Sequence, residues 1–452
     1  MSQYWLRYFP PFLRRQLKGR HYLQRVIDNA GWVLGERLVR YTLGLFIGVW
    51  IARYVGPEQY GLLNYAAAYV VVLAFMSTLG LDSLAVRNLV RDPDTCEETL
   101  GTLLVMRLAG GLFLILAAVL GLLILQPDDE RATALVLLIA GAQVMQAFDS
   151  IDCWFQANVI SRYTVIAKLS AISTVTAVRV ALILMEAPLV AFAWAVLVES
   201  SVLAAGMLIV YRLSGRHLTS LRPRWSRARR LLADGWPLIL SASVAAVYAR
   251  IDQVMLGQFT GFAAVGEYAI SVRVIEFTQI VPTVMALSVF PALIKSRELG
   301  RDQYRARAQT FHSVMLWLGV AVAIPLSLGA TPLVQTIFGS SYEGAGPVLA
   351  IMAWTPIWMF ISLARQRWLF AESEERIGVV VDCTGCLLNV AANLILIPRF
   401  GALGAAVASL IAPVGATFLI APFSKAIRES LLMYGMAVMA PGRICLRARR
   451  YL

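Results

Sequence analysis

Residues 31–69 read GWVLGERLVRYTLGLFIGVWIARYVGPEQYGLLNYAAAY. The stretch contains a long apolar run, a short turn with Gly56, and the beginning of a second apolar run. A helix that crosses a lipid bilayer needs about 20 mostly apolar residues. We therefore interpret the stretch as two membrane-spanning helices joined by a turn, and we look for the same pattern along the rest of the chain.

The composition of the 452 residues supports a membrane protein, because 59% of them are hydrophobic and only 15% are charged. The mean hydropathy is +0.69. An ordinary soluble domain has about 25% charged residues, so this chain has too few charges to cover soluble domains. A net charge of +13 would indicate nucleic acid in a soluble protein. In a membrane protein it reflects Lys and Arg in cytoplasmic loops, and we expect no nucleic-acid partner.

Twelve apolar runs are long enough to cross a membrane. They lie near 30–52, 62–84, 99–125, 132–151, 164–185, 188–211, 237–257, 262–293, 310–337, 347–370, 377–397 and 402–423. We therefore expect an all-α membrane protein with about 12 transmembrane helices. Its expected parts are an interfacial segment (1–28), a six-helix bundle (29–211), a basic cytoplasmic linker (212–235), a second six-helix bundle (236–424) and a basic cytoplasmic tail (425–452).

The distribution of basic residues gives an orientation to these spans. If the N-terminus is cytoplasmic, the segments expected on the cytoplasmic side hold 31 of the 40 Lys and Arg, and the opposite connections hold 3. Positive charge accumulates in cytoplasmic loops. The asymmetry therefore predicts twelve spans with both termini in the cytoplasm.

The two halves resemble each other. The second half begins GWPLILSASVAAVYARIDQVMLGQFTGFAAVGEYAISVR at Gly235. Trp32 precedes Gly61 by 29 residues, and Trp236 precedes Gly266 by 30. Repeated bundles are a transporter architecture in which the substrate site lies between the repeats. We therefore expect two bundles related by pseudo-two-fold symmetry.

The stretch LGLFIGVWIARYVGPEQYGLLNYAAAYVVVLAFMSTLGLDSLAVRNLVRD (43–92) carries a family resemblance. Its A-R-Y-x-G-P-x-Q-Y-G turn and the following T-L-G-L-D…R resemble the Wzx-type polysaccharide repeat-unit flippases, members of the multidrug/oligosaccharidyl-lipid/polysaccharide exporter superfamily. The resemblance implies a MATE-like and MurJ-like fold in the cytoplasmic membrane. It also implies flipping of an undecaprenyl-diphosphate-linked oligosaccharide, such as an O-antigen or exopolysaccharide unit, by alternating access through a cationic cavity. Polysaccharide polymerases and glycosyltransferases would be partners, and no catalytic residue carries over.

Ionisable residues inside the spans are the candidate site residues, because charge in the membrane is costly and marks function. We expect substrate-binding arginines and coupling or pairing acids: Arg37, Arg40, Arg250 and Arg273, and Glu36, Glu199, Asp252 and Glu276. Guanidinium groups are suited to phosphate because they donate two parallel hydrogen bonds. The alternative is structural ion pairing, which we favour for Arg107 and Arg179 because the repeat gives them no counterpart.

Asp82 and Arg87 lie where the second span is expected to end at the cytoplasmic face. They are candidates for an inner gate, and an ion pair at a helix end is an equally good interpretation.

Three other functions remain open. A cation-coupled drug exporter of the same superfamily would rely on a membrane acid such as Glu36 or Glu199. A lipid II flippase would be expected to have two extra spans. A polymerase or ligase would need a long outer loop, and every outer connection here is short. The chain has no Walker motif, and Cys383 and Cys386 lack further metal ligands nearby. We therefore expect a transporter rather than an enzyme, without a metal or cofactor.

Overall fold

The computed structural model describes residues 21–126, 129–298 and 300–439, and all regular structure in these ranges is helical. Most of the predicted interfacial segment (1–28) and the end of the predicted tail (440–452) lie outside the described residues. The all-α prediction is confirmed.

The described residues of the first half form eight α-helices and three 3-10 turns. They are α2 (His21–Leu73), α3 (Phe75–Thr78), α4 (Asp82–Arg91), η2 (Pro93–Thr95), α5 (Cys96–Leu125), α6 (Glu130–Met145), η3 (Gln146–Asp149), α7 (Ser150–Ala157), α8 (Arg162–Leu184), α9 (Leu189–Leu213) and η4 (Leu218–Ser220). The second half consists of α10 (Trp225–Phe259), α11 (Phe262–Thr278), α12 (Ile280–Glu298), α13 (Arg301–Leu328), α14 (Ala330–Phe338), η5 (Ser340–Tyr342), α15 (Ala345–Met352), α16 (Thr355–Ala371), α17 (Glu375–Ile420), η6 (Ala421–Phe423) and α18 (Lys425–Met439).

Ten helical runs of the described residues are long and apolar enough to cross a membrane. Two of them contain a kink, at Gly56 of α2 and at Gly401 of α17, where φ is positive (78° and 55°). α2 has 53 residues and α17 has 46, or roughly 80 Å and 70 Å at 1.5 Å per residue. The hydrocarbon core measures only about 30 Å. Each kinked helix is therefore long enough to cross twice, which accounts for the twelve predicted spans.

α10 begins at Trp225, within the predicted linker 212–235. Two arginines of this region contact the start of α5. Arg224 forms an ion pair with Glu98 at 2.9 Å, and Arg227 Nη2 donates to Thr99 Oγ1 at 2.8 Å. These contacts attach the helix that opens the second half to the first half.

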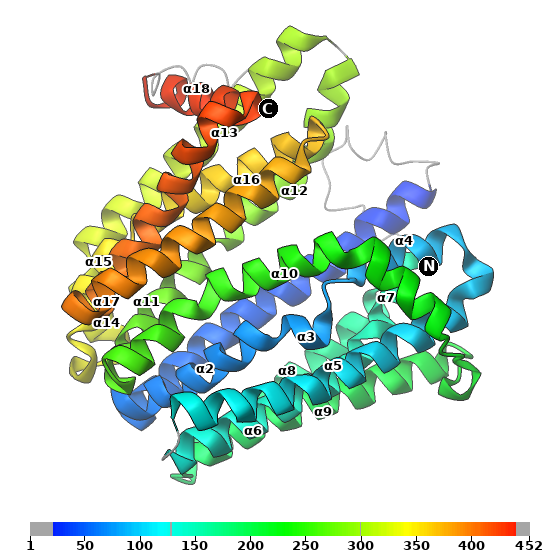
Figure 1. The fold of residues 1–452 in the computed structure, drawn as a ribbon, viewed down its shortest axis with the longest axis horizontal. Helices are drawn as coiled ribbons and strands as arrows, with labels where there is room; N and C mark the ends of the chain where they lie inside the picture. The colour runs from blue at the N-terminus through cyan, green and yellow to red at the C-terminus, as the bar shows by residue number, and fades with distance from the viewer. Residues whose placement is uncertain (1–20, 127–128, 299, 440–452) are drawn as a thin grey trace.

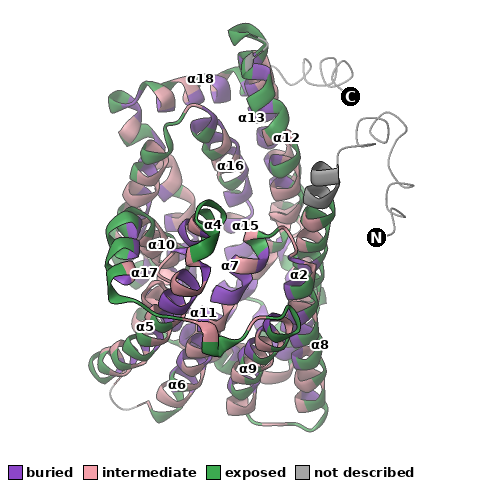
Figure 2. Cartoon of the chain, turned by 90° about the vertical axis from the view of Figure 1, so that its right-hand side faces the viewer, coloured by how far each residue is buried: buried purple, intermediate pink, exposed green. Residues whose placement is uncertain are grey.

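The helices of each half pack mainly on one another. α5, α6, α8 and α9 pack together with α2, and α10, α12, α13, α16 and α17 form the other group (Figure 1). Buried residues lie where helices meet, and exposed residues cover the outward faces (Figure 2). Many outward side chains are large and apolar, such as Ile124, Leu184 and Leu387 at 82%, 71% and 72% exposed. Such a surface is suited to lipid rather than water.

The halves meet along α2, which crosses α11 and also packs on α10 (Figure 1). A Cβ at Gly61 would overlap the Phe262 carbonyl oxygen and lie 2.8 Å from the Gly266 backbone nitrogen. A Cβ at Gly266 would in turn overlap the Pro57 carbonyl oxygen. The two glycines that correspond in the sequence repeat therefore lie against each other, and the crossing requires both to lack a side chain.

Hydrogen bonds between the halves surround this crossing. Tyr342 Oη donates to the Ala52 carbonyl at 2.8 Å, and Gln258 Nε2 donates to Tyr65 Oη at 2.6 Å. Arg53 of the first half donates to the Thr336 carbonyl of the second half. The largest buried cluster also draws residues from both halves here. The halves are thus tightly joined near the Gly56 kink.

We predict that Gly61→Ala destabilises the protein by about 1–3 kcal/mol, because overpacking against backbone atoms forces helices apart. The measurement is the midpoint of thermal unfolding of the purified protein in detergent. Gly35→Ala is the matched control, since a Cβ there meets nothing within 4 Å and alanine favours the helix. Equal midpoints for the two variants would contradict the tight crossing.

Candidate functional site

An ion-pair network joins three helices of the first half. Arg40 on α2 contacts Glu36, one turn away, at 2.6 Å and lies 4.0 Å from Glu199 on α9. Glu199 also binds Arg179 of α8 at 3.0 Å. Although Arg40 lies within a span, 40% of its side chain is exposed. Its guanidinium is therefore partly available to a ligand, while two carboxylates limit its positive charge.

Arg273 reaches from α11 of the second half to α2 of the first. Its Nη1 donates to the Gly44 carbonyl at 3.0 Å. A Cβ at Gly48 would overlap that same Nη1 atom. The guanidinium therefore lies over glycines of α2, and Gly44 is one turn beyond Arg40. Because Arg40 and Gly44 are one turn apart, the guanidinium groups of Arg40 and Arg273, one from each half, lie on the same face of α2.

Arg250 of α10 and Glu276 of α11 form a second ion pair, at 2.8 Å. Their side chains are 28% and 41% exposed. Glu276 lies three residues after Arg273, so the two share a face of α11. This pair therefore continues the charged surface begun by Arg40 and Arg273.

The four arginines outnumber the three glutamates in this set, which we call the arginine cluster: Arg40, Arg179, Arg250, Arg273, Glu36, Glu199 and Glu276. It carries one excess positive charge when all seven are ionised. Arg37 is exposed, and within the described residues it makes no ion pair with the cluster. The structure therefore brings together three of the four predicted arginines and adds Arg179.

Asp252 lies two residues from Arg250 and does not pair with it, because residues two apart on a helix face different directions. It is only 7% exposed. Its carboxylate accepts hydrogen bonds from Tyr268 at 2.6 Å, Ser409 at 2.7 Å and Asn393 at 2.5 Å. Within the described residues no cation pairs with it. A buried carboxylate among neutral donors can exchange a proton or a cation.

The sequence analysis did not identify some of the polar residues around Asp252 and in the arginine cluster. Asn389 and Asn393 bond each other at 3.1 Å, and their i, i+4 spacing in an apolar run was a readable signal. Arg179 and Glu199 lie on neighbouring helices, so their pairing left no local signal. Arg365, which lies within the predicted span near 347–370, is 3% exposed and donates to Thr417 at 2.8 Å.

The helix-end ion pair considered between Asp82 and Arg87 does not form in the described residues. Asp82 pairs instead with Arg107 of α5 at 2.6 Å, while Arg87 is exposed. Five residues apart on α4, Asp82 and Arg87 lie on different faces. The structural ion pairing that we favoured for Arg107 is present. The inner gate suggested for Asp82 and Arg87 stays a prediction.

Comparison with known proteins gives the family. The chain matches the family described as polysaccharide biosynthesis protein over residues 26–297. It is 25% identical to the “Probable low-salt glycan biosynthesis flippase Agl15” of Haloferax volcanii over 46% of this chain and 44% of that protein. It is 20% identical to the “Putative O-antigen transporter” of Escherichia coli K12, over 82% and 89% of the two chains. The chain thus spans less than half the length of the first relative.

Solved structures share the fold. The lipid II flippase MurJ in an inward closed conformation has a TM-score of 0.68 at 15% identity, over 89% of this chain and 90% of its own. An inward-facing multidrug MATE transporter has a TM-score of 0.67 at 13% identity, over 86% and 96%. The chain therefore belongs to the polysaccharide biosynthesis protein family and is a multi-pass membrane protein with the fold shared by the MurJ and MATE transporters.

Proposed function

We propose that the protein flips an undecaprenyl-diphosphate-linked oligosaccharide repeat unit from the inner to the outer leaflet of the cytoplasmic membrane, for surface polysaccharide biosynthesis. The arginine cluster carries this proposal. A diphosphate is negatively charged and must cross about 30 Å of hydrocarbon. Partly exposed guanidinium groups within the spans offer it paired hydrogen bonds. The names of the archaeal and bacterial relatives point to the same class of substrate.

The glutamates of the cluster give the site a way to release its ligand. Arg40 and Arg250 already have carboxylate partners at 2.6 and 2.8 Å. A phosphate oxygen entering the site replaces a carboxylate oxygen, so binding exchanges one anion for another rather than neutralising a bare charge. The net gain is therefore modest, which allows alternating access to proceed.

The arrangement of the spans supports an orientation for this cycle. Both termini would lie in the cytoplasm, with the six-helix bundles 29–211 and 236–424 on either side of the linker. In this orientation the Gly56 kink lies toward the outer face. The α2–α11 crossing then closes the outer side of the interface between the two halves. Outward opening requires this crossing to separate. Polysaccharide polymerase would act on the delivered unit, and glycosyltransferases would supply it.

Asp252 is the best candidate for a coupling acid, and Glu199 is the second. Asp252 is buried among neutral hydrogen-bond donors, so its charge calls for a proton or cation. Glu199 is already shared by two arginines. A buried acid of this kind also supports the alternative, a cation-coupled drug exporter. The excess of arginines favours an anionic substrate over the cationic drugs that such an exporter would carry.

The experiment that tests the function locates the lipid-linked repeat unit in cells lacking this protein. We expect the unit to accumulate on the inner leaflet and surface polymer to be lost, because translocation is the missing step. The measurement is labelling of the glycan by a reagent that does not cross the membrane, in intact and in permeabilised cells.

Two outcomes of this experiment would contradict the proposal. Single unpolymerised units on the outer leaflet would indicate a polymerase. Normal surface glycan together with a new drug sensitivity would indicate the drug exporter.

We predict that Arg40→Ala and Arg250→Ala each lower glycan export by about tenfold or more, since a hydrogen bond to a charged group contributes about 1.5–3 kcal/mol. Export is measured as surface polymer, and membrane insertion by the amount of protein in the membrane fraction. Arg399→Ala, an exposed arginine outside the cluster, should leave export unchanged. Full export by both stable variants would exclude the cluster as the substrate site.

We predict that Gly48→Ala lowers export as much as Arg273→Ala while the protein stays folded. The added methyl displaces only the end of a flexible side chain. The double variant should be no worse than Arg273→Ala alone, because both changes remove one interaction. Gly44→Ala is the matched control, since a Cβ there meets nothing within 4 Å. Additive losses in the double variant would separate Gly48 from Arg273.

A further inference from the structure

The first turns of α10 have one packed face and one open face. On the packed face, Ala228, Leu231 and Gly235 follow one another at intervals of three and four residues, and all three are buried. Leu231 belongs to the same buried cluster as Leu81 of the first half, and a Cβ at Gly235 would overlap Leu81 Cδ2. This packing fixes which side of the helix points away from the first half.

The open face carries four exposed side chains, which we call the α10 stripe: Trp225, Arg229, Leu232 and Trp236. They follow one another at intervals of four, three and four residues, so they lie on one side of the helix over about 17 Å. The two tryptophans are 82% and 62% exposed, and Leu232 is 38% exposed. Large apolar side chains aligned on one exposed face mark an interaction surface.

The segment that carries the stripe is strongly basic. Residues 222–236 read RPRWSRARRLLADGW and contain five arginines and one acid, Asp234. Asp234 lies nine residues after Trp225, which places it on the opposite side of the helix from the stripe. Two of the arginines bind α5, as described above. The other three are exposed, and within the described residues their side chains have no ion pair and no hydrogen bond: Arg222, Arg229 and Arg230.

The stripe lies where α10 enters its membrane span. α10 is long and apolar enough to cross a membrane, and the sequence predicts that its span starts near residue 237, directly after Trp236. Pro237 lies inside the helix, where proline removes a backbone hydrogen bond and allows a bend. Figure 1 shows α10 changing direction near its start, and Figure 2 shows exposed residues along it. The bend allows the stripe to lie along the membrane surface instead of projecting from it.

We propose that the α10 stripe, with Arg222 and Arg230 beside it, binds the headgroups of anionic phospholipids in the cytoplasmic leaflet. Tryptophan is enriched at the level of the headgroups, because its ring is apolar and its N–H needs a polar partner. Guanidinium groups donate paired hydrogen bonds to phosphate oxygens.

Charge complementarity and the tryptophans together identify this occupant. Each basic residue near an anionic leaflet strengthens binding by about fivefold. The general accumulation of basic residues in cytoplasmic loops accounts for the arginines, but it does not account for two exposed tryptophans on the same face. An acidic protein would match the arginines and would leave the indole rings without an apolar environment. A phospholipid supplies both, with a charged headgroup beside an acyl chain.

The test measures quenching of tryptophan fluorescence in the purified full-length protein, reconstituted in phosphatidylcholine vesicles. Matched vesicles contain an equal mole fraction of dibrominated phosphatidylglycerol, which is anionic, or of dibrominated phosphatidylcholine, which is neutral. Bromine quenches only the tryptophans that it contacts. We expect stronger quenching by the anionic lipid, and we expect high salt to reduce the difference because it screens surface charge. The vesicles contain no glycan, so the result does not depend on the proposed flipping.

Two sets of variants assign the effect to the stripe. Replacing both tryptophans, by Trp225→Phe and Trp236→Phe, should remove most of the excess quenching by the anionic lipid. Arg229→Gln should lower the preference for the anionic lipid by about fivefold and leave quenching by phosphatidylcholine unchanged. Arg399→Gln is the matched control, because Arg399 is an exposed arginine near the kink of α17, and it should keep the full preference.

Three outcomes would overturn the proposal. Equal quenching by the two lipids in the unaltered protein would show that the surface does not select anionic lipid. Excess quenching that survives the double tryptophan replacement would place the contact at other tryptophans and leave the stripe in water, open to an acidic protein. An equal loss of preference in Arg229→Gln and Arg399→Gln would show a response to net charge alone. If Arg229→Gln does not fold, Arg222→Gln takes its place in the comparison.

Discussion

The crossing of α2 and α11 at Gly61 and Gly266 is the constraint on which the charged site depends. With backbone in contact with backbone, the relative position of the two helices is fixed where they cross. Arg273 lies seven residues, about two turns, further along α11. Its guanidinium therefore arrives over α2 without needing its own counter-ion to hold it. A side chain at either glycine would move the helix axes apart and withdraw Arg273 from the Gly44 carbonyl.

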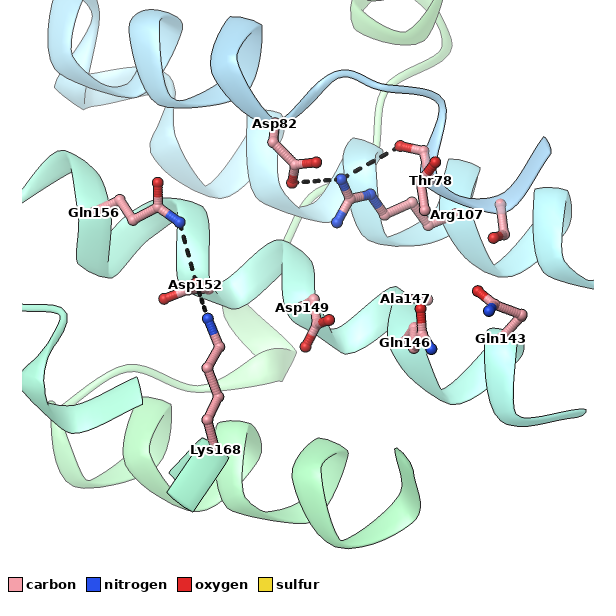
Figure 3. Close-up of a pocket in the computed structure, with 11 residues that line it drawn as sticks. Thr78, Asp82, Arg107, Gln143, Gln146, Ala147, Asp149, Asp152, Gln156 and Lys168 are labelled. Atoms are coloured by element: carbon pink, nitrogen blue, oxygen red, sulfur yellow. Dashed lines mark hydrogen bonds and ion pairs between the residues drawn. The ribbon is translucent and has the colours of Figure 1, made fainter. Parts of the chain in front are cut away.

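The ion pair of Arg107 differs from those of Arg40 and Arg250 in how far the arginine is exposed, and therefore in whether the arginine can bind a ligand. Arg107 pairs with Asp82 (Figure 3). The Arg107 side chain is only 4% exposed, whereas that of Asp82 is 57% exposed. Arg40 and Arg250 are 40% and 28% exposed. Loss of Asp82 would leave the buried Arg107 guanidinium uncompensated and cost up to about 3–5 kcal/mol, whereas the partly exposed guanidinium groups of Arg40 and Arg250 exchange partners at a lower cost. Exposure thus separates the arginines suited to a mobile anionic ligand from the one that holds a helix break together.

Much of the fold was predictable because each span satisfies its backbone hydrogen bonds internally, so an apolar run of sufficient length specifies a helix. The spans near residues 30–52 and 62–84 were predicted on this basis. The pairing of Glu36 with Arg40 was also readable, since both lie on one helix at i, i+4. The partners of Arg273, Asp82 and Asp252 were not. Their contacts join different helices, and hydrophobic periodicity carries no information about which helices meet.

Asp252 lies buried in the second half, where it accepts hydrogen bonds from Tyr268, Ser409 and Asn393 of the same half. Within the described residues it makes no ion pair with the arginine cluster, so a proton or cation at Asp252 would not neutralise the substrate directly. Its effect must pass through the helices that supply its ligands. For Asp252 these include α10, which also carries Arg250, and the two residues face different sides of that helix. A cation would therefore act by stiffening helices, whereas the diphosphate would act by replacing carboxylates between them.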